Sequence, residues 1–119
     1  MQWRAGSPVT AQLAVPARYE GFTGVVHGGT IAAILDDGMW HAVWHATHLN
    51  AATAELSVRY RHPVLTEVPL AVQAWADAAH HRLVEAHAAL CDADGRVLAQ
   101  AQARFMPGSS VHRPAAAPP

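Results

Sequence analysis

The sequence predicts an α+β fold in which about five antiparallel strands wrap around one long helix. Three observations support this prediction. Apolar residues recur with a helical period over residues 28–46, and they alternate with a period of two in four segments after residue 52. The tetrapeptide Asp92-Ala93-Asp94-Gly95 separates the last two segments, as a β-hairpin turn does. One long helix beside consecutive antiparallel strands is typical of a sheet layer packed on that helix.

The first half of the domain is expected to form a strand, a turn-rich passage and the helix. Residues 9–15 alternate as a strand that ends at Pro16. The passage from Tyr19 to Gly29 holds four glycines, which predicts backbone that turns or lies close to another group. The helix is expected to be about 18 residues long. Its apolar arc consists of Ile31, Ala32, Ile34, Leu35, Met39, Ala42, Val43 and Ala46.

The second half is predicted to consist of four strands in a meander. These strands cover residues 53–60, 68–77, 82–91 and 96–105. In the first of them Leu56, Val58 and Tyr60 share one face, as strand alternation requires. Such a sheet has two edge strands, and one edge can pair with a second subunit.

The composition describes one small domain and excludes several classes of protein. The chain has 119 residues, of which 51% are hydrophobic, and this length fits one domain, assigned to residues 1–106. Residues 107–119 are rich in proline and alanine, which predicts a disordered tail. Eight arginines against nine acidic residues, with no basic stripe, argue against nucleic-acid binding.

Further features of the composition favour the cytoplasm. The single cysteine, Cys91, cannot form an internal disulfide, and we expect a buried structural thiol in a reducing compartment. Residues 1–20 have no basic region followed by an apolar run, so no signal peptide is expected. The chain also lacks a continuous apolar stretch of about 18 residues, so no membrane association is expected.

The start of the predicted helix is the most specific candidate for a catalytic site. His27, Gly28 and Gly29 lie where backbone N–H groups have no partner inside the helix. The amide of Gly28, with no Cβ in its way, can approach a substrate carbonyl and stabilise an oxyanion. Asp36 lies two turns further along at the rim of the apolar arc, a place suited to a general base or nucleophile. A glycine-rich helix cap has the same local pattern, so these residues alone leave both interpretations open.

Several segments together resemble the hotdog-fold acyl-CoA thioesterases of the PaaI-like branch. They are Tyr19-Glu20-Gly21, Gly24-Val25-Val26-His27-Gly28-Gly29, Ile34-Leu35-Asp36-Asp37, the strand 53–60 followed by Pro63, and Asp94-Gly95-Arg96-Val97-Leu98-Ala99. The resemblance covers residues 19–106. It implies a sheet of about five strands around one long central helix. It also implies hydrolysis of an acyl- or aryl-CoA thioester to a free acid and CoA, without a metal or redox cofactor.

The resemblance implies roles for four catalytic residues. Asp36 matches the acidic residue that acts as general base on water or as nucleophile. Gly28 matches the residue whose N–H polarises the thioester carbonyl, and His27 matches a histidine that shapes this loop. Thr53 matches a Ser/Thr position that orients the water and reaches the aspartate from the neighbouring subunit. The site would then form only in a homodimer, and we expect two dimers to pair into a homotetramer.

Four further residues are expected to bind substrate. Gly29 lies beside the oxyanion donor, while Arg61, His62 and Arg82 would meet the CoA phosphates. Each of the last three is equally consistent with a solvent-facing residue at a strand end.

The chain departs from the family pattern at two places. Gly21 stands where several relatives carry an asparagine, which removes one hydrogen bond to the water or the carbonyl. The family often has an arginine directly before the proline, but here His62 precedes Pro63 and the arginine is shifted to position 61. The rate or the mechanism can therefore differ from that of the relatives.

Two alternatives remain open. One concerns a helix face with spacing that a zinc site could use, formed by Asp37, His41, His45 and His48. Because no Cys or Glu joins these residues, a polar helix face is favoured and no metal is predicted.

The other concerns function. The chain could be a non-catalytic protein that binds acyl-CoA, or a thioesterase for acyl groups on a carrier protein.

Overall fold

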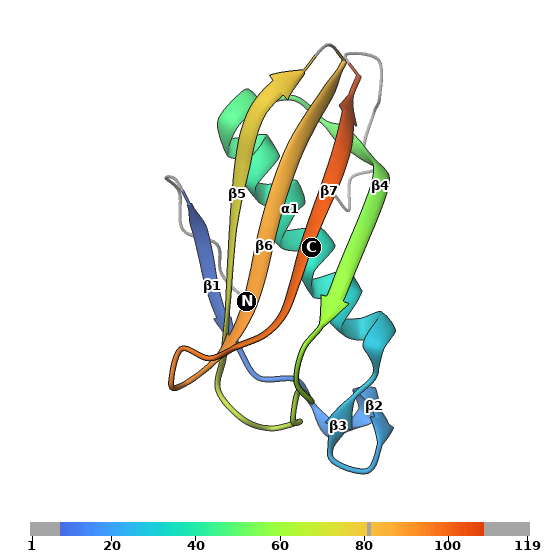
Figure 1. Ribbon diagram of the computed structural model, residues 1–119, viewed down its shortest axis with the longest axis vertical. Coiled ribbons are helices and arrows are strands. Elements are labelled where there is room, and N and C mark those ends of the chain that lie inside the picture. Colours follow the sequence, from blue (N-terminus) through green and yellow to red (C-terminus); the bar gives the residue numbers. More distant parts are fainter. Residues whose placement is uncertain (1–7, 81, 109–119) are drawn as a thin grey trace.

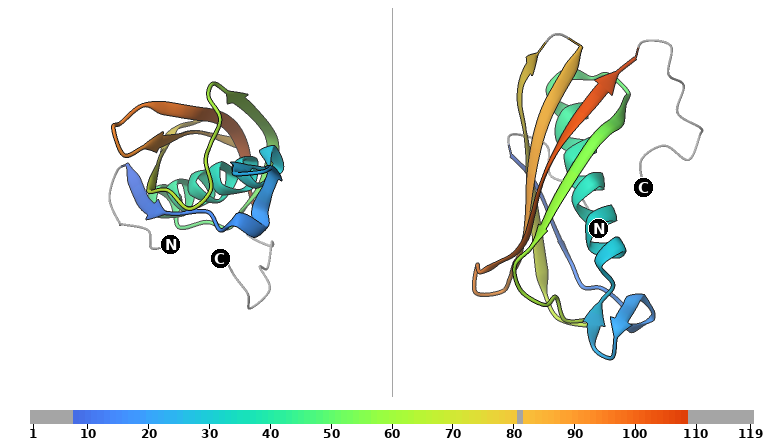
Figure 2. Two further views of the ribbon diagram at one scale, coloured as in Figure 1. Left: turned by 90° about the horizontal axis from the view of Figure 1, so that it is seen from below. Right: turned by 45° about the vertical axis from the view of Figure 1, so that its right-hand side comes forward.

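A computed structural model describes residues 8–80 and 82–108. Its elements are β1 (Val9–Leu13), the 3-10 helix η1 (Ala17–Tyr19), β2 (Glu20–Phe22), β3 (Val25–Val26), α1 (Gly28–Thr47), β4 (Ala51–Tyr60), β5 (Leu70–His80), β6 (Leu83–Asp92) and β7 (Val97–Pro107). Five strands form an antiparallel sheet, while β2 and β3 form a separate small hairpin. The predicted α+β fold is confirmed, because the sheet curls around α1 as Figure 2 shows.

The order of the strands in the sheet is β1-β5-β6-β7-β4. The predicted meander is correct for β5, β6 and β7 but wrong for β4, which pairs with β7 instead of β5. The chain therefore crosses from one side of the sheet to the other after β4, and β1 and β4 become the two edges (Figure 1). Alternation along a strand specifies which face is buried, but it does not specify the neighbouring strand.

The core combines small residues on the sheet with large residues on the helix. The inner face of the sheet is lined by buried alanines at positions 74, 86, 88, 99, 101 and 103. These small side chains leave room for Leu35, Met39 and Trp40 of α1, all of which are buried. Trp40 also donates from its indole Nε1 to the carbonyl of Ala51 at 3.1 Å, which fixes the helix against the start of β4.

Both ends of α1 are closed by histidines. The His27 Nδ1 accepts a hydrogen bond from the Gly29 N–H at 2.9 Å, so this side chain caps the first turn. At the other end His48 adopts a left-handed conformation with φ 59°, and its N–H donates to the Trp44 carbonyl. The helix is therefore one residue longer at its end than predicted.

The predicted hairpin between β6 and β7 is present. Asp92 Oδ1 accepts from the N–H groups of Asp94 and Arg96, each at 3.0 Å, and Gly95 has a φ of 83° that a residue with a Cβ rarely adopts. Asp92 and Gly95 thus shape this turn through local chemistry that is visible in the sequence.

Two details at the ends of strands correct the sequence-based expectations. Pro107 still belongs to β7, opposite Ala51, and the Gly108 N–H donates to the Asn50 carbonyl, so the ordered domain passes residue 106. The rest of the predicted tail, 109–119, lies outside the described residues. Cys91 is half-buried rather than fully buried, because its side chain lies on the outer face of β6. Within the described residues, no helix is long and apolar enough to cross a membrane.

Candidate active site

The loop before α1 is held by backbone hydrogen bonds on both sides. The Val26 N–H donates to the Val64 carbonyl at 2.8 Å, and the His27 carbonyl accepts from the N–H groups of Thr30 and Ile31. The Gly29 N–H is taken by the His27 side chain. In the described part of the chain, no acceptor takes the Gly28 N–H, so this amide remains available at the positive end of the helix.

This arrangement separates the two glycines that the sequence singled out. The N–H of Gly28 has no acceptor among the described residues, whereas the N–H of Gly29 is already engaged. A Cβ on Gly29 would lie 3.1 Å from His27 Cε1 and Nδ1, so the close approach of the imidazole requires glycine there. Gly29 therefore supports the His27 contact and does not offer its own N–H to substrate.

Asp36 and Thr53 form the second half of the candidate site. The Thr53 hydroxyl donates to Asp36 Oδ1 at 2.7 Å, and Asp36 is half-buried. Both residues belong to the same chain, so this contact is made without the neighbouring subunit that the resemblance implied. With its one proton given to Oδ1, the hydroxyl leaves Asp36 Oδ2 to accept a proton from another group.

A β-bulge explains why Thr53 reaches the helix. Between Thr53 and Glu55, β4 has one residue more than β7, so Thr53 lies opposite the buried Phe105 while Glu55 lies opposite Arg104. Without the bulge, strict alternation would place Thr53 on the outer face with Glu55. The extra residue, Ala54, turns the hydroxyl inward toward Asp36 of α1.

The two halves of the site are far apart within one chain. Gly28 and Asp36 are eight residues apart on one helix, which corresponds to about 12 Å along its axis. An oxyanion donor and a base that act on one thioester carbonyl must each lie about 3 Å from the reacting atoms. Within one chain the two residues are therefore separated by about four times that distance.

The far end of β4 carries a residue that the sequence analysis did not assign to the site. The Tyr60 hydroxyl donates to the Gly28 carbonyl at 2.7 Å. A Cβ on Gly28 would lie 3.6 Å from Tyr60 Cζ, so the ring packs directly beside this glycine. The signal in the sequence is a tyrosine on the inward face at the end of a strand, but nothing local connects it to a loop 32 residues earlier.

The predicted CoA-binding residues are only partly brought together. Arg61 and His62 follow β4 directly, and the Arg61 Nε donates to Gln100 Oε1 at 2.7 Å. Arg96, which the sequence analysis did not single out, places its Nη2 2.9 Å from His62 Nδ1. Arg82 is exposed and precedes β6 at the opposite end of the sheet (Figure 1), so the structure does not bring it to this cluster within one chain.

The polar helix face considered as a metal site forms other contacts. His41 Nε2 lies 3.8 Å from Asp37 Oδ1, and the His41 ring packs edge-on against Trp40. His48 caps the helix and packs edge-on against Trp44. Trp40 and Trp44 stack with their ring centroids 5.8 Å apart.

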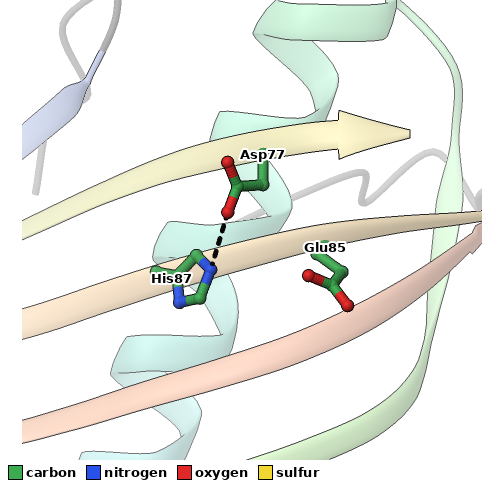
Figure 3. Close-up of side chains that lie close together, drawn as sticks. All are labelled: Asp77, Glu85 and His87. Carbon is green, nitrogen blue, oxygen red and sulfur yellow. Dashed lines mark hydrogen bonds and ion pairs between the residues drawn. The ribbon is translucent and has the colours of Figure 1, made fainter. Parts of the chain in front are cut away.

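A different group could approach a cation. Among the described residues, Asp77, Glu85 and His87 place one ligand atom each within 4.8 Å of one another on the outer face of the sheet (Figure 3). His87 Nε2 lies 3.0 Å from Asp77 Oδ2, and Glu85 pairs with Arg104 at 3.6 Å. A cation here would compete with Arg104 for Glu85. A hollow of about 460 Å³ lies beside this group, and none of its lining residues belongs to the helix-start loop or the Asp36–Thr53 pair.

Comparisons with known proteins identify the family of the chain. The sequence model of the thioesterase superfamily matches residues 23–99, more than half of the chain. No curated protein matches the chain.

Several solved structures share its fold. A thioesterase superfamily protein is 26% identical with a TM-score of 0.80 over 87% of this chain, which spans only 54% of that protein. A phenylacetic acid degradation-related protein from Ralstonia eutropha is 22% identical, with a TM-score of 0.78 over 88% of this chain and 83% of that one. A hypothetical thioesterase from Streptococcus pneumoniae, solved with coenzyme A, is 15% identical, with a TM-score of 0.78 over 87% of this chain and 80% of that one. The chain therefore belongs to the thioesterase superfamily and has its hotdog fold.

Proposed function

We propose that the protein is an acyl-CoA thioesterase that hydrolyses an acyl- or aryl-CoA thioester in a site shared by two copies of the chain. The observation that carries this proposal is the available Gly28 N–H at the start of α1, two turns from a carboxylate that Thr53 already orients. A donor for the oxyanion and a base for water are the two groups that thioester hydrolysis needs. The coenzyme A in the structurally similar S. pneumoniae protein supports a CoA-linked substrate.

The chemistry follows from the free atoms of these groups. The thioester carbonyl oxygen accepts from the Gly28 N–H, which becomes a stronger contact as the oxygen gains negative charge. Asp36 Oδ2 takes a proton from water, and the water oxygen attacks the carbonyl carbon. The tetrahedral intermediate then loses its C–S bond, the CoA thiolate takes up a proton, and the acid is released. Direct attack by Asp36 would instead form a mixed anhydride that water opens.

The edge strand β4 supports a homodimer as the complete enzyme. Leu56 lies opposite buried Ala103 and faces inward, yet 41% of its surface is exposed. An edge strand with an uncovered apolar inner row favours pairing with a second copy. Phe22 at 82% exposure and Leu65 at 51% add apolar surface in the β2–β3 region.

The positions of the site residues on β4 give the register of this pairing. Thr53 contacts Asp36 near one end of the strand, and Tyr60 contacts Gly28 at the other end. If two β4 strands pair antiparallel about the midpoint between Leu56 and Ser57, then Thr53 of one copy lies opposite Tyr60 of the second copy. Asp36 of one copy is thereby brought toward Gly28 of the other. This dimer removes the separation of about 12 Å within one chain.

The first experiment measures thiol release from a panel of acyl- and aryl-CoA thioesters. We expect Asp36→Asn to lower kcat about 10²- to 10⁴-fold, because the variant keeps the shape but loses the base. Asp37→Asn is the matched control on the same helix, and we expect it to keep most of the activity. Full activity of Asp36→Asn would contradict the assignment. Incorporation of ¹⁸O from labelled water into Asp36, detected by mass spectrometry, would show the anhydride route.

The second experiment tests whether the site is shared. Gly28→Pro removes the donor N–H at the first helical position, where proline is well tolerated. His27, with φ −59° and ψ 137°, already has the conformation that precedes a proline. A mixed dimer of Gly28→Pro and Asp36→Asn chains, isolated with two tags, contains one intact shared site. It should therefore show about half of the wild-type activity, whereas each variant alone should keep only a measurable residual activity, about 10²-fold or more below that of the wild type. A mixed dimer at background activity would mean that each chain holds its own site.

The non-catalytic alternative has one observation in its favour. A Cβ on Gly21 would lie 3.3 Å from His27 Cα, so this loop lacks both the amide of several relatives and the space beside His27 to add one freely. Binding of acyl-CoA by calorimetry without thiol release would favour this alternative. Hydrolysis of acyl groups on a carrier protein, but not on CoA, would favour a thioesterase that is specific for carrier-bound acyl groups.

A further inference from the structure

We propose that Tyr60 is a positioning residue, which together with His27 clamps the peptide group between Gly28 and Gly29 and so aims the Gly28 N–H. This inference rests on the proposed oxyanion role of that N–H. Tyr60 itself does not touch the substrate in this proposal, since it acts through the backbone.

The two contacts hold opposite ends of one planar group. The carbonyl of Gly28 and the N–H of Gly29 belong to the same peptide unit, which is rigid and planar. Tyr60 donates to the carbonyl at 2.7 Å, and His27 Nδ1 accepts from the N–H at 2.9 Å. Because the Nδ1 accepts, the neutral His27 ring carries its proton on Nε2. A planar group bonded at both ends can no longer rotate about its flanking Cα atoms without losing one of the bonds.

The clamp matters because both flanking residues are glycines. Glycine has the least restricted φ and ψ, so the orientation of the Gly28 N–H is not limited by a side chain of its own. The Gly28 N–H belongs to the preceding peptide unit, whose His27 carbonyl accepts from the N–H groups of Thr30 and Ile31. With the following unit held by Tyr60 and His27, the Gly28 Cα is fixed from both sides, and the N–H is kept from turning away from the position where an oxyanion forms. An oxyanion donor contributes most when it is fixed before the reaction, since its reorientation then costs nothing in the transition state.

The location of Tyr60 argues against a simple packing role. Its side chain is 51% exposed, and it is not part of the buried core. The side of the ring that is covered lies against Gly28, with Cζ, Oη and Cε1 all within 3.7 Å of a Cβ built there. Since Thr53 orients Asp36 from the same strand, β4 positions the oxyanion donor at one end and the base at the other.

The test begins with Tyr60→Phe, which removes only the hydroxyl. We expect kcat to fall several-fold, up to about tenfold, the scale of one hydrogen bond, while KM and Tm stay close to wild type. Tyr19→Phe removes the hydroxyl of the chain's other tyrosine, whose ring lies under the Arg18 guanidinium, and serves as the matched control with unchanged kcat. A loss of kcat that only follows a fall in Tm would overturn the proposal.

A double-mutant cycle separates positioning from any other effect of the hydroxyl. In a Gly28→Pro background the N–H is absent, so Tyr60→Phe should cause no further loss of kcat. An equal loss in both backgrounds would show that Tyr60 acts elsewhere.

A measurement without substrate distinguishes this inference from the proposed function. In the amide NMR spectrum, Tyr60→Phe should shift the Gly28 and Gly29 resonances and speed exchange of the Gly29 N–H. Unchanged amides would overturn the clamp even in an active enzyme. If Tyr60→Phe changes these amide resonances in a protein that never releases CoA, the clamp is supported and the thioesterase proposal fails.

Discussion

The strands β6 and β4 have the same length in the same sheet, but their surroundings are opposite. Along the ten residues of β6, buried and half-buried positions alternate, because β5 and β7 cover its edges and α1 covers its inner face. Nearly every position of the ten-residue β4 is exposed, including the inward Leu56 and Tyr60. We infer that β6 mainly stabilises the fold, whereas β4 makes the contacts to Asp36 and Gly28 and lacks a neighbouring strand on one edge.

The largest effect that tests this comparison is expected from Leu56→Arg. A charge on the inner row of β4 should prevent pairing of two copies, because it would be buried without a partner. We expect a monomer by analytical ultracentrifugation and activity near background, although Asp36, Thr53 and Gly28 are unchanged. Leu56→Met conserves volume and should remain dimeric and active. An active Leu56→Arg monomer would refute the role of β4 in a shared site.

The next effect is in stability, and its concentration dependence should differ between the strands. Leu90 on β6 is 0% exposed, so Leu90→Ala should lower the free energy of unfolding by about 2–5 kcal/mol. Leu56→Ala on β4 should act mainly through the dimer, so its effect on Tm should depend on protein concentration. Chemical denaturation and melting at several concentrations measure both. If the loss of Tm depended on protein concentration for Leu90→Ala but not for Leu56→Ala, the roles assigned to β6 and β4 would be contradicted.

The smallest effect concerns thiol reactivity on the two strands. Burial, and to a lesser extent the charge of Asp92, raises the pKa of the Cys91 thiol on β6. Less thiolate is then present at a given pH, so iodoacetamide should modify Cys91 more slowly than a free thiol, with a rate that rises with pH. Arg59→Cys in a Cys91→Ser background places a thiol on exposed β4 and should react several-fold faster. Asp92→Asn should speed modification of Cys91 slightly, and equal rates by mass spectrometry would contradict the difference in environment.

The sequence predicted the elements well where the signal was local. The helical period located α1, because each turn of the apolar arc had to face the same core. The turn at Asp92 was equally local, since an aspartate side chain and a glycine within four residues satisfy its geometry. His27 and Gly28 could be singled out because the first N–H groups of any helix lack a partner inside the helix.

The features that the sequence did not reveal depend on contacts between distant residues. The placement of Thr53 depends on a one-residue bulge at Ala54. A bulge interrupts the alternating pattern of a strand, so the pattern in the sequence does not show where the bulge lies. Arg82 and Arg61 were both expected to meet the CoA phosphates, but within one chain Arg82 lies at the β5–β6 turn and Arg61 follows the other end of β4. Arg96 joined His62 only because β7 lies beside β4.

The long helix, its glycine-rich start, the carboxylate two turns along and the alternating strands can all be predicted from the residues, because they depend on periods and turn chemistry within short windows. The edge position of β4, the inward turn of Thr53 to Asp36 and the contact of Tyr60 with the Gly28 carbonyl are visible in the folded chain alone. An antiparallel strand satisfies the same alternation beside any neighbour. Which residues then meet is set by the packing of the whole sheet on α1.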